Sequence, residues 1–235
     1  GLTAEQVANE YKVSRESQDL FAYESHQKAI KALEKKKFSG QIAPIKVKEI
    51  YLDENLKKKE RETTFSEDQG PRKDTSIEVL SKLRPVFSAT GSVTAGNSSQ
   101  MSDGAAFVMI VSEKMLKKLN VEPIAKLIGY SVAGLPPKIM GMGPVRAVPK
   151  VLDQVGMKLK EIELFELNEA FASQSIAVIN ELKLEKDIVN VNGGAIALGH
   201  PLGCSGAKLS VQLFDEMKLR KLKYGMVTML SLIHI

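Results

Sequence analysis

Residues 190–207 read Asn-Val-Asn-Gly-Gly-Ala-Ile-Ala-Leu-Gly-His-Pro-Leu-Gly-Cys-Ser-Gly-Ala. Five glycines fall within the fourteen residues from Gly193 to Gly206. A strand pattern precedes them and a helical pattern follows, so the glycines predict a tight turn whose backbone lies close to a ligand or another segment. His200 lies inside this turn, which makes it a candidate base or oxyanion donor. From the residues alone, a purely structural turn histidine is an equal alternative.

A second polar stretch precedes the turn. Residues 164–172 read Leu-Phe-Glu-Leu-Asn-Glu-Ala-Phe-Ala. The pattern predicts a strand over 163–167 that ends at Asn168 and a helix over 169–182 that follows directly. A side-chain amide in that place can hold a water molecule or donate to a substrate oxygen. The simpler interpretation is that Asn168 caps the helix.

The rest of the chain alternates between helical and strand patterns, which favours a layered α/β domain. The expected helices are 3–12, 14–37, 112–119, 144–155 and 203–217. The expected strands are 45–47, 105–111, 124–133, 188–192 and 224–229, with an exposed loop over 53–75. The run 105–111 suits a strand buried on both faces. In the helix over 14–37, the expected buried residues are Leu20, Phe21, Ala29, Ile30 and Leu33, and His26 is expected at the surface.

Composition excludes several classes of protein. The chain has 235 residues, 43% of them hydrophobic, which is enough apolar material for a core and excludes wholesale disorder. No apolar run is long enough to cross a bilayer, and the first residues do not resemble a signal peptide. The single cysteine, Cys204, excludes a disulfide scaffold, and three histidines are too few for a His-rich cluster. We therefore expect no metal site.

The net charge of +5 is concentrated in one region. Residues 31–61 hold ten Lys or Arg and five Asp or Glu. Interspersed acids and few aromatic residues make a nucleic-acid patch less favoured than a solvated helix end and surface loop. Attraction of a phosphate-bearing small molecule is an intermediate interpretation.

The two polar stretches together resemble the thiolase family, above all 3-ketoacyl-CoA thiolases and acetyl-CoA acetyltransferases. The resemblance rests on residues 168–172 and 192–203 and extends over nearly the whole chain. It implies a thiolase-like layered α/β/α core domain, incomplete here, with a CoA-binding loop region. The implied divisions are 1–101 for the CoA-binding loop region, 102–122 for the returning segment of the N-terminal core domain, 123–229 for the C-terminal core domain and 230–235 for a non-native tail.

The resemblance also implies roles for individual residues. His200 matches the histidine that activates the nucleophilic cysteine and helps to hold the thioester oxygen. Asn168 matches the asparagine that holds a water molecule for oxyanion stabilisation. The matched CoA-contacting positions are Ser99 and Ala95 along the pantetheine tunnel, Phe87 and Met140 around the pantetheine and acyl end, and Arg72 beside the nucleotide. Coenzyme A is a substrate here, so no cofactor is expected.

Two features depart from the family pattern. The family takes its nucleophilic cysteine from an N-terminal half, and this sequence does not contain such a half. A second, acid/base cysteine belongs to a Cys-x-Gly-Gly-Gly stretch, where this chain reads Leu-Ser-Leu-Ile-His-Ile over 230–235. We therefore expect a truncated coding sequence with a foreign tail. Cys204 occupies a position where relatives often carry Ala or Thr, so it is expected to be a small buried hydrophobic residue rather than the nucleophile.

The function implied by the resemblance is acyl transfer. The intact enzyme would cleave a 3-oxoacyl-CoA with CoA to acetyl-CoA and a shortened acyl-CoA, as in fatty acid beta-oxidation. The alternatives are a biosynthetic thiolase that condenses two acetyl-CoA molecules and a non-enzymatic CoA-binding fragment. The expected partners are CoA, acyl-CoA and further copies in a dimer or tetramer, without nucleic acid or membrane. The expected compartment is the bacterial cytoplasm, or the mitochondrial or peroxisomal matrix in a eukaryote.

Overall fold

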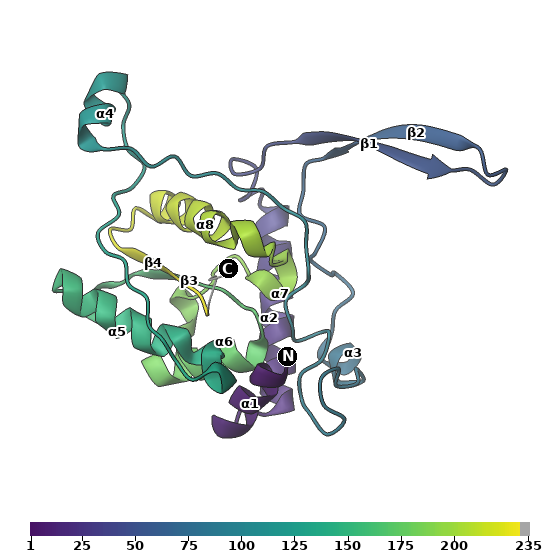
Figure 1. The fold of residues 1–235 in the computed structure, drawn as a ribbon, viewed down its shortest axis with the longest axis horizontal. Coiled ribbons are helices and arrows are strands. Elements are labelled where there is room, and N and C mark those ends of the chain that lie inside the picture. Colours follow the sequence, from purple (N-terminus) through teal and green to yellow (C-terminus); the bar gives the residue numbers. More distant parts are fainter. Residues whose placement is uncertain (231–235) are drawn as a thin grey trace.

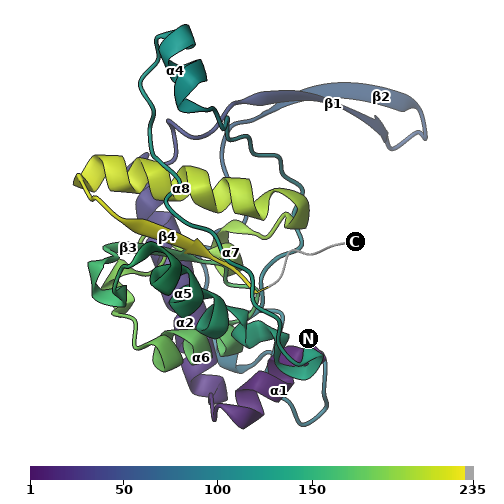
Figure 2. The ribbon, with the colours of Figure 1, turned by 60° about the vertical axis from the view of Figure 1, so that its left-hand side comes forward.

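The computed structural model describes residues 1–230, in which helices enclose a two-stranded parallel sheet (Figure 1). β3 (Leu164–Leu167) pairs with β4 (Gly225–Thr228). Figure 2 shows α8 (Ser205–Arg220) on one side of this sheet and α5 (Gly143–Val155) and α6 (Ala172–Leu182) on the other. This layered arrangement agrees with the predicted α/β class.

Both faces of β3 are covered, because all four of its residues are buried. Phe165, which is fully buried, belongs to a core cluster with Val148 and Leu152 of α5 and Val178 of α6. Val189 adds a single parallel bridge to Phe165, so the strand expected over 188–192 is reduced to one pairing. Apolar runs covered on both sides are typical of parallel sheets.

Two helices begin the chain, α1 (Leu2–Glu10) and α2 (Arg15–Glu34). Ser14 caps α2, because its hydroxyl accepts a hydrogen bond from the Ser17 amide at 3.2 Å. The face of α2 expected to be buried was predicted partly wrongly: Ala29 is buried, Leu20 is 46% exposed, and Phe21, Ile30 and Leu33 are half-buried. The residues that α2 buries are Gln18, Asp19, Ala22, Ser25, His26, Ala29 and Ala32.

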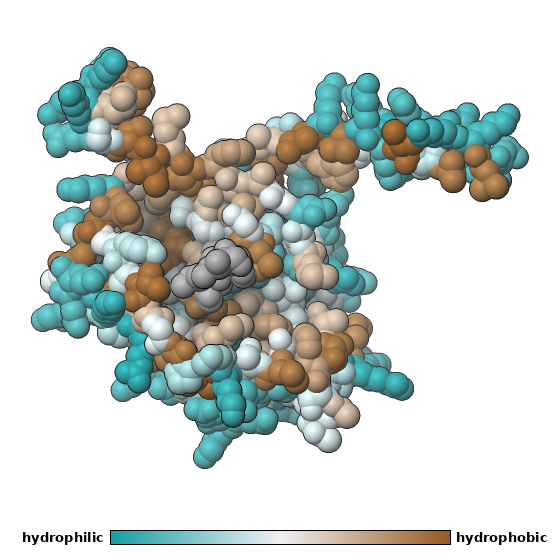
Figure 3. Space-filling view, viewed as in Figure 1, coloured by the Kyte–Doolittle hydropathy of each residue, from teal (hydrophilic) through white to brown (hydrophobic). Residues whose placement is uncertain are grey.

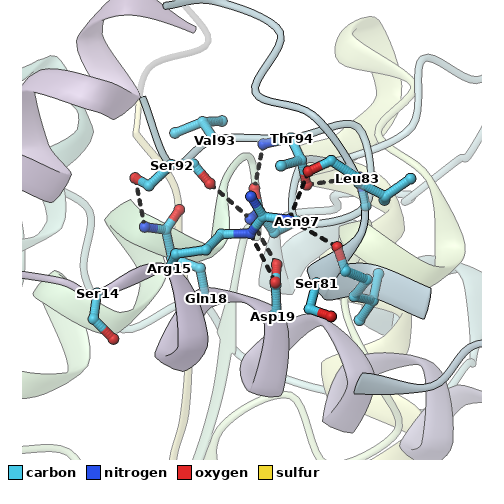
Figure 4. A network of polar contacts seen from close by, with 12 residues as sticks. Ser14, Arg15, Gln18, Asp19, Ser81, Leu83, Ser92, Val93, Thr94 and Asn97 are labelled. Atoms are coloured by element: carbon cyan, nitrogen blue, oxygen red, sulfur yellow. Dashed lines mark hydrogen bonds and ion pairs between the residues drawn. The ribbon is translucent and has the colours of Figure 1, made fainter. Parts of the chain in front are cut away.

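The N-terminal part of α2 presents polar side chains to neighbouring loop segments (Figure 4). Arg15 pairs with Asp19 at 2.7 Å and donates to the backbone carbonyls of Leu80 and Leu83. Asp19 in turn accepts from the Asn97 side-chain amide at 3.0 Å. Buried polar groups need such partners, so loop 92–97 is fixed against α2 by hydrogen bonds.

A charged hairpin projects from the body of the molecule (Figure 1). β1 (Ile45–Leu52) and β2 (Lys58–Phe65) are antiparallel and almost entirely exposed. The strand expected around 45–47 is therefore longer than predicted. The exposed loop expected over 53–75 was predicted wrongly in part, because β2 lies within it and cross-strand pairs such as Glu49–Arg61 stabilise it.

The apolar segment 105–111 is extended but forms no strand, which contradicts its predicted burial. Phe107 is 90% exposed and Ile110 is 85% exposed. The run 124–133 also lacks strand structure, although Lys150 of α5 donates to the carbonyl of Val132. Within residues 1–230 no strand lies beside either run to pair with its backbone groups. Figure 3 shows the resulting apolar residues along the segment that leads to α4 (Glu113–Leu119).

Short elements complete the fold and the region around the glycine turn. They are α3 (Ile77–Ser81), η1 (Pro137–Met142), η2 (Leu159–Glu161), η3 (Lys186–Ile188), α7 (Ala195–Leu198) and η4 (Leu202–Cys204). None of the helices in the described part of the chain combines the length and hydrophobicity that a bilayer-spanning segment requires. The expected non-native tail over 230–235 lies outside the described residues except for Leu230.

Candidate active site

Asn168 directly follows β3 and is 3% exposed. Its backbone amide donates to the Thr228 carbonyl at 3.0 Å, which extends the β3–β4 pairing by one bond. The helix that follows begins at Ala172 and its N-cap residue is Phe171. The interpretation of Asn168 as a helix cap is therefore wrong, and its side-chain amide Nδ2 lies instead 3.4 Å from His200 Nε2.

The glycine turn presents His200 to this amide. The His200 backbone amide donates to the Gln100 carbonyl at 3.0 Å, which ties the turn to segment 98–102. Gly199 has φ +83°, a conformation that favours glycine, and a Cβ there would overlap the Ser102 hydroxyl. The predicted tight turn is present, and a close backbone approach explains this glycine.

The tautomer of the His200 ring depends on where the Ser205 hydroxyl proton points. Nδ1 lies 2.6 Å from the Ser205 hydroxyl, which also lies 3.1 Å from the Pro201 carbonyl. With that proton on the Pro201 carbonyl, the Ser205 oxygen accepts from Nδ1–H. Nε2 then carries the lone pair and faces the Asn168 NH₂ group. A group so arranged can remove a proton as a base and afterwards donate a hydrogen bond to an oxyanion.

Glu169 stabilises the residues around the site by hydrogen bonds. The sequence patterns did not predict it as a functional residue. Its carboxylate accepts hydrogen bonds from the Ser25 hydroxyl at 2.7 Å, the Asn190 amide at 2.8 Å and the Ile196 backbone at 3.2 Å. Burial raises the pKa of Glu169, and these hydrogen bonds oppose the shift. A Cβ at Gly194 would overlap the carboxylate, so Glu169 packs directly on the turn. The sequence feature that could have identified Glu169 is its position beside Asn168 in the same motif.

Two of the predicted CoA-contacting residues lie on the Asn168 side of the site. The Ser99 backbone donates to the Ala170 carbonyl at 2.9 Å. The Phe87 ring contacts the Phe171 ring edge to face, with 6.0 Å between centroids. Segments far apart in sequence thus meet residues 170–171, two to three positions after Asn168.

The remaining three predicted contacts lie on separate surfaces. Ala95 is an exposed residue of the loop that α2 holds, and Met140 is exposed on η1. The Arg72 side chain is exposed, whereas its backbone amide donates to His26 Nδ1 at 3.1 Å. His26 is 4% exposed, which contradicts its predicted surface position. It is buried because it anchors the loop that carries Arg72.

Cys204 is half-buried at the end of the turn. Burial raises the pKa of its thiol, and the nearby Lys208 charge opposes the shift. A thiol with a raised pKa is a weak nucleophile because the thiolate is the reactive form. Within residues 1–230, no group of three or more His, Cys, Asp or Glu side chains is placed to hold a metal ion.

Comparisons with known proteins identify the class of this fold and site. The family model "Thiolase, N-terminal domain" matches residues 1–114, and "Thiolase, C-terminal domain" matches residues 121–231. The chain belongs to the thiolase family.

Individual relatives agree with this assignment. A 3-ketoacyl-CoA thiolase from Bacillus subtilis is 53% identical over 97% of this chain and 59% of its own length. The structure of Bacillus anthracis acetyl-CoA acetyltransferase superposes with a TM-score of 0.92 at 44% identity, over 98% of this chain and 56% of that one. Human mitochondrial 3-ketoacyl-CoA thiolase gives a TM-score of 0.87 at 40% identity, over 97% and 56%. The chain thus spans less than two thirds of the relatives it matches.

Proposed function

We propose that this chain is the part of an acetyl-CoA C-acyltransferase that supplies the oxyanion-stabilising groups and the base. The enzyme would cleave a 3-oxoacyl-CoA with free CoA to acetyl-CoA and a shortened acyl-CoA. The observation that carries the proposal is the 3.4 Å approach of Asn168 Nδ2 to His200 Nε2, which brings together two residues from separate motifs.

In the proposed reaction, this chain supplies the base and the oxyanion-stabilising groups, and a cysteine outside it supplies the nucleophile. The acyl group would rest on that cysteine, since the raised pKa of Cys204 makes it unsuited as nucleophile. His200 Nε2 would take the proton from the thiol. His200 and a water molecule held by Asn168 would then stabilise the developing oxyanions. CoA enters as substrate, and no cofactor is part of the proposal.

The predicted CoA-contacting residues fit this proposal as a binding region. Ser99 and Phe87 adjoin residues 170–171, and the side chains of Ala95, Met140 and Arg72 are exposed. We propose that the pantetheine arm follows Ser99 and Ala95 toward His200, with the nucleotide near Arg72. The basic stretch 31–61 would then attract the CoA phosphates rather than nucleic acid.

The experiment joins this chain to the remaining segments of the Bacillus subtilis relative and measures thiolysis of acetoacetyl-CoA. We expect turnover in this chimera and a loss of several orders of magnitude in His200→Ala. The chain alone is expected to be inactive. Turnover by the chain that Cys204→Ser abolishes would overturn the assignment of the nucleophile, and a fully active His200→Ala chimera would overturn the role of the turn.

The proposal also covers the direction of the reaction, the cellular compartment and the oligomeric state. Leu198 and the Gly-Cys-Ser-Gly turn favour the degradative enzyme of beta-oxidation over the biosynthetic one. A comparison of acetoacetyl-CoA with longer 3-oxoacyl-CoA substrates in the chimera distinguishes the two. The relatives named at 46–53% identity are bacterial, which favours the cytoplasm as compartment. A homo-oligomer is also proposed, to be measured by light scattering of the chimera.

A further inference from the structure

Lys208 lies on the first turn of α8, three positions after Ser205. Its Nζ donates to the Gly199 carbonyl at 3.4 Å. That carbonyl belongs to the peptide bond between Gly199 and His200. The N–H of the same peptide donates to Gln100, so both of its polar groups have partners.

Several acidic groups influence the pKa of Lys208. Asp68, Glu166 and Glu169 raise it, together with the Cys204 thiol. Glu166 is 1% exposed, and its Oε2 has no hydrogen-bond partner in the part of the chain that the structure describes. Burial raises the pKa of Glu166 to about 8, and the charge of Lys208 opposes the shift.

This position is unfavourable for a lysine on two counts. Burial lowers the pKa of Lys208, which means that its charged form loses hydration. The first turn of a helix also carries the positive end of the helix dipole, which repels a cation. The Gly199 carbonyl accepts a hydrogen bond from the ammonium, and nearby acidic groups favour the charged form of Lys208, so both effects are opposed.

The first turn of α8 therefore holds the catalytic turn at two points. Ser205 contacts the His200 ring at Nδ1, and Lys208 contacts the peptide that precedes the ring. We propose that Lys208 is a positioning residue for His200: the Lys208 ammonium donates to the Gly199 carbonyl, fixes the Gly199–His200 peptide and keeps His200 Nε2 beside Asn168. This inference rests on the proposed function only in its kinetic consequences.

Gln100 gives the turn a second connection. Its side-chain amide donates to the carbonyl of Gly70 at 3.0 Å. The same amide donates to the Ile196 carbonyl in the turn at 3.0 Å. The loop that carries Arg72 is thereby linked to the His200 turn through Gln100.

The test compares Lys208→Met, which removes the charge, with Lys208→Arg, which keeps it. Lys218→Met is the matched control, because Lys218 is exposed on the same helix. In the chimera, Lys208→Met should lower kcat about 10²-fold, the size expected for a small misplacement of a catalytic group. The KM for CoA should stay within about twofold, and Lys208→Arg and Lys218→Met should retain most of the turnover.

A second readout uses the chain itself and needs no activity. The nitrogen chemical shifts of His200, assigned with His200→Gln, report its tautomer. We expect the Nδ1–H form in the parent chain and in Lys208→Arg, and a mixture of tautomers in Lys208→Met. An unchanged tautomer together with kcat within twofold of the parent in Lys208→Met would overturn the inference. Equal losses in Lys208→Arg and Lys208→Met would also overturn it, because they would indicate packing rather than charge. An inactive parent chimera with the expected shifts would refute the proposed function and leave the positioning role supported.

Discussion

The segment 164–172, which contains the polar residues Glu166, Asn168 and Glu169, is largely buried, whereas the apolar segment 105–111 is largely exposed. Glu166, Asn168 and Glu169 are each at most 3% exposed, while Phe107 is 90% exposed. Asn168 and Glu169 have hydrogen-bond partners within the chain, on α2, on the glycine turn and on β4. The apolar segment has no neighbouring strand in residues 1–230.

This contrast shows that burial follows the availability of partners rather than hydropathy alone. A buried carboxylate is tolerated where several donors meet it, as they do at Glu169. An apolar run suited to the middle of a sheet remains in solvent when no strand lies beside it, and exposed runs of this kind favour association. The candidate site is thus complete in its internal support, whereas the segment 105–111 requires a covering partner.

The sharpest test of the contrast substitutes one phenylalanine in each region. Phe165→Ala should lower the free energy of unfolding by about 3–5 kcal/mol, because it leaves a cavity in the core. Phe107→Ala should change it by less than about 0.5 kcal/mol, because the side chain has few contacts to lose. Chemical denaturation of the purified chain measures both values. Similar losses in the two variants would show that the segment 105–111 is packed after all.

Joining the chain to the remaining segments of the Bacillus subtilis relative should remove the difference in burial between Phe165 and Phe107. If those segments supply strands beside 105–111, Phe107→Ala should become destabilising by about 2–4 kcal/mol in the chimera. The expected accompanying change is weaker binding of a hydrophobic dye by the chimera than by the chain. A Phe107→Ala variant that remains neutral in the chimera would contradict a covered position.

Within the buried region, Asn168 tests the chemistry rather than the packing. Asn168→Ala should lower kcat of the chimera about 10²–10³-fold, the size expected when one oxyanion-stabilising donor is lost. Asn55→Ala, in the exposed hairpin turn, serves as control. Full turnover in a folded Asn168→Ala chimera would show that the 3.4 Å approach to His200 has no catalytic consequence.

A smaller effect is expected at Ser99. Ser99→Ala should raise the KM for CoA a few-fold and leave kcat nearly unchanged, because a pantetheine contact is made equally in the ground and transition states. Ser39→Ala, at an exposed serine, should change neither constant. A fall in kcat with constant KM would instead place Ser99 among the groups that contact the reacting atoms.

The smallest expected effect concerns stability and pH at His26. Burial lowers its pKa in the folded state from the usual 6.5, and the Arg72 charge adds to the shift. Because the unfolded chain then binds the proton more readily, stability is fully present above pH 6.5 and falls as the pH drops below it. We expect a loss of at most about 1.4 kcal/mol per pH unit, reduced in His26→Asn. Denaturation curves at pH 7.5 and 5.5 measure it, and identical slopes in both proteins would contradict a neutral buried histidine.

Sequence patterns located the main features of the site correctly. The end of the strand at Leu167, the tight turn around His200 and the helices near 144–155 and 203–217 all follow from local periodicity and glycine placement. The pairing of Asn168 with the end of β3 was predictable because a strand delivers the residue after it to the sheet edge. The resemblance to thiolases then supplied roles that periodicity could not.

Other features depended on contacts between distant parts of the chain. The burial of His26 requires the loop at Arg72, and the burial of Glu169 requires Ser25, Asn190 and the turn. Neither contact leaves a local signal, because the partners lie between 21 and 144 positions away. The exposure of 105–111 was mispredicted for the same reason, since hydropathy indicates what a segment can bury but not whether a neighbour exists.

Local patterns therefore indicate the end of β3, the glycine turn and the approximate starts of several helices, because backbone conformation there depends on a few neighbouring side chains. Only the tertiary structure decides which side chains meet at those ends. Hydrogen bonds between elements determine three features of the site. Ser205 contacts the His200 ring, Ser25 donates to the Glu169 carboxylate, and Lys208 donates to the Gly199 carbonyl. Such bonds form only once packing has removed water from both partners, which is why no single segment of the sequence specifies them.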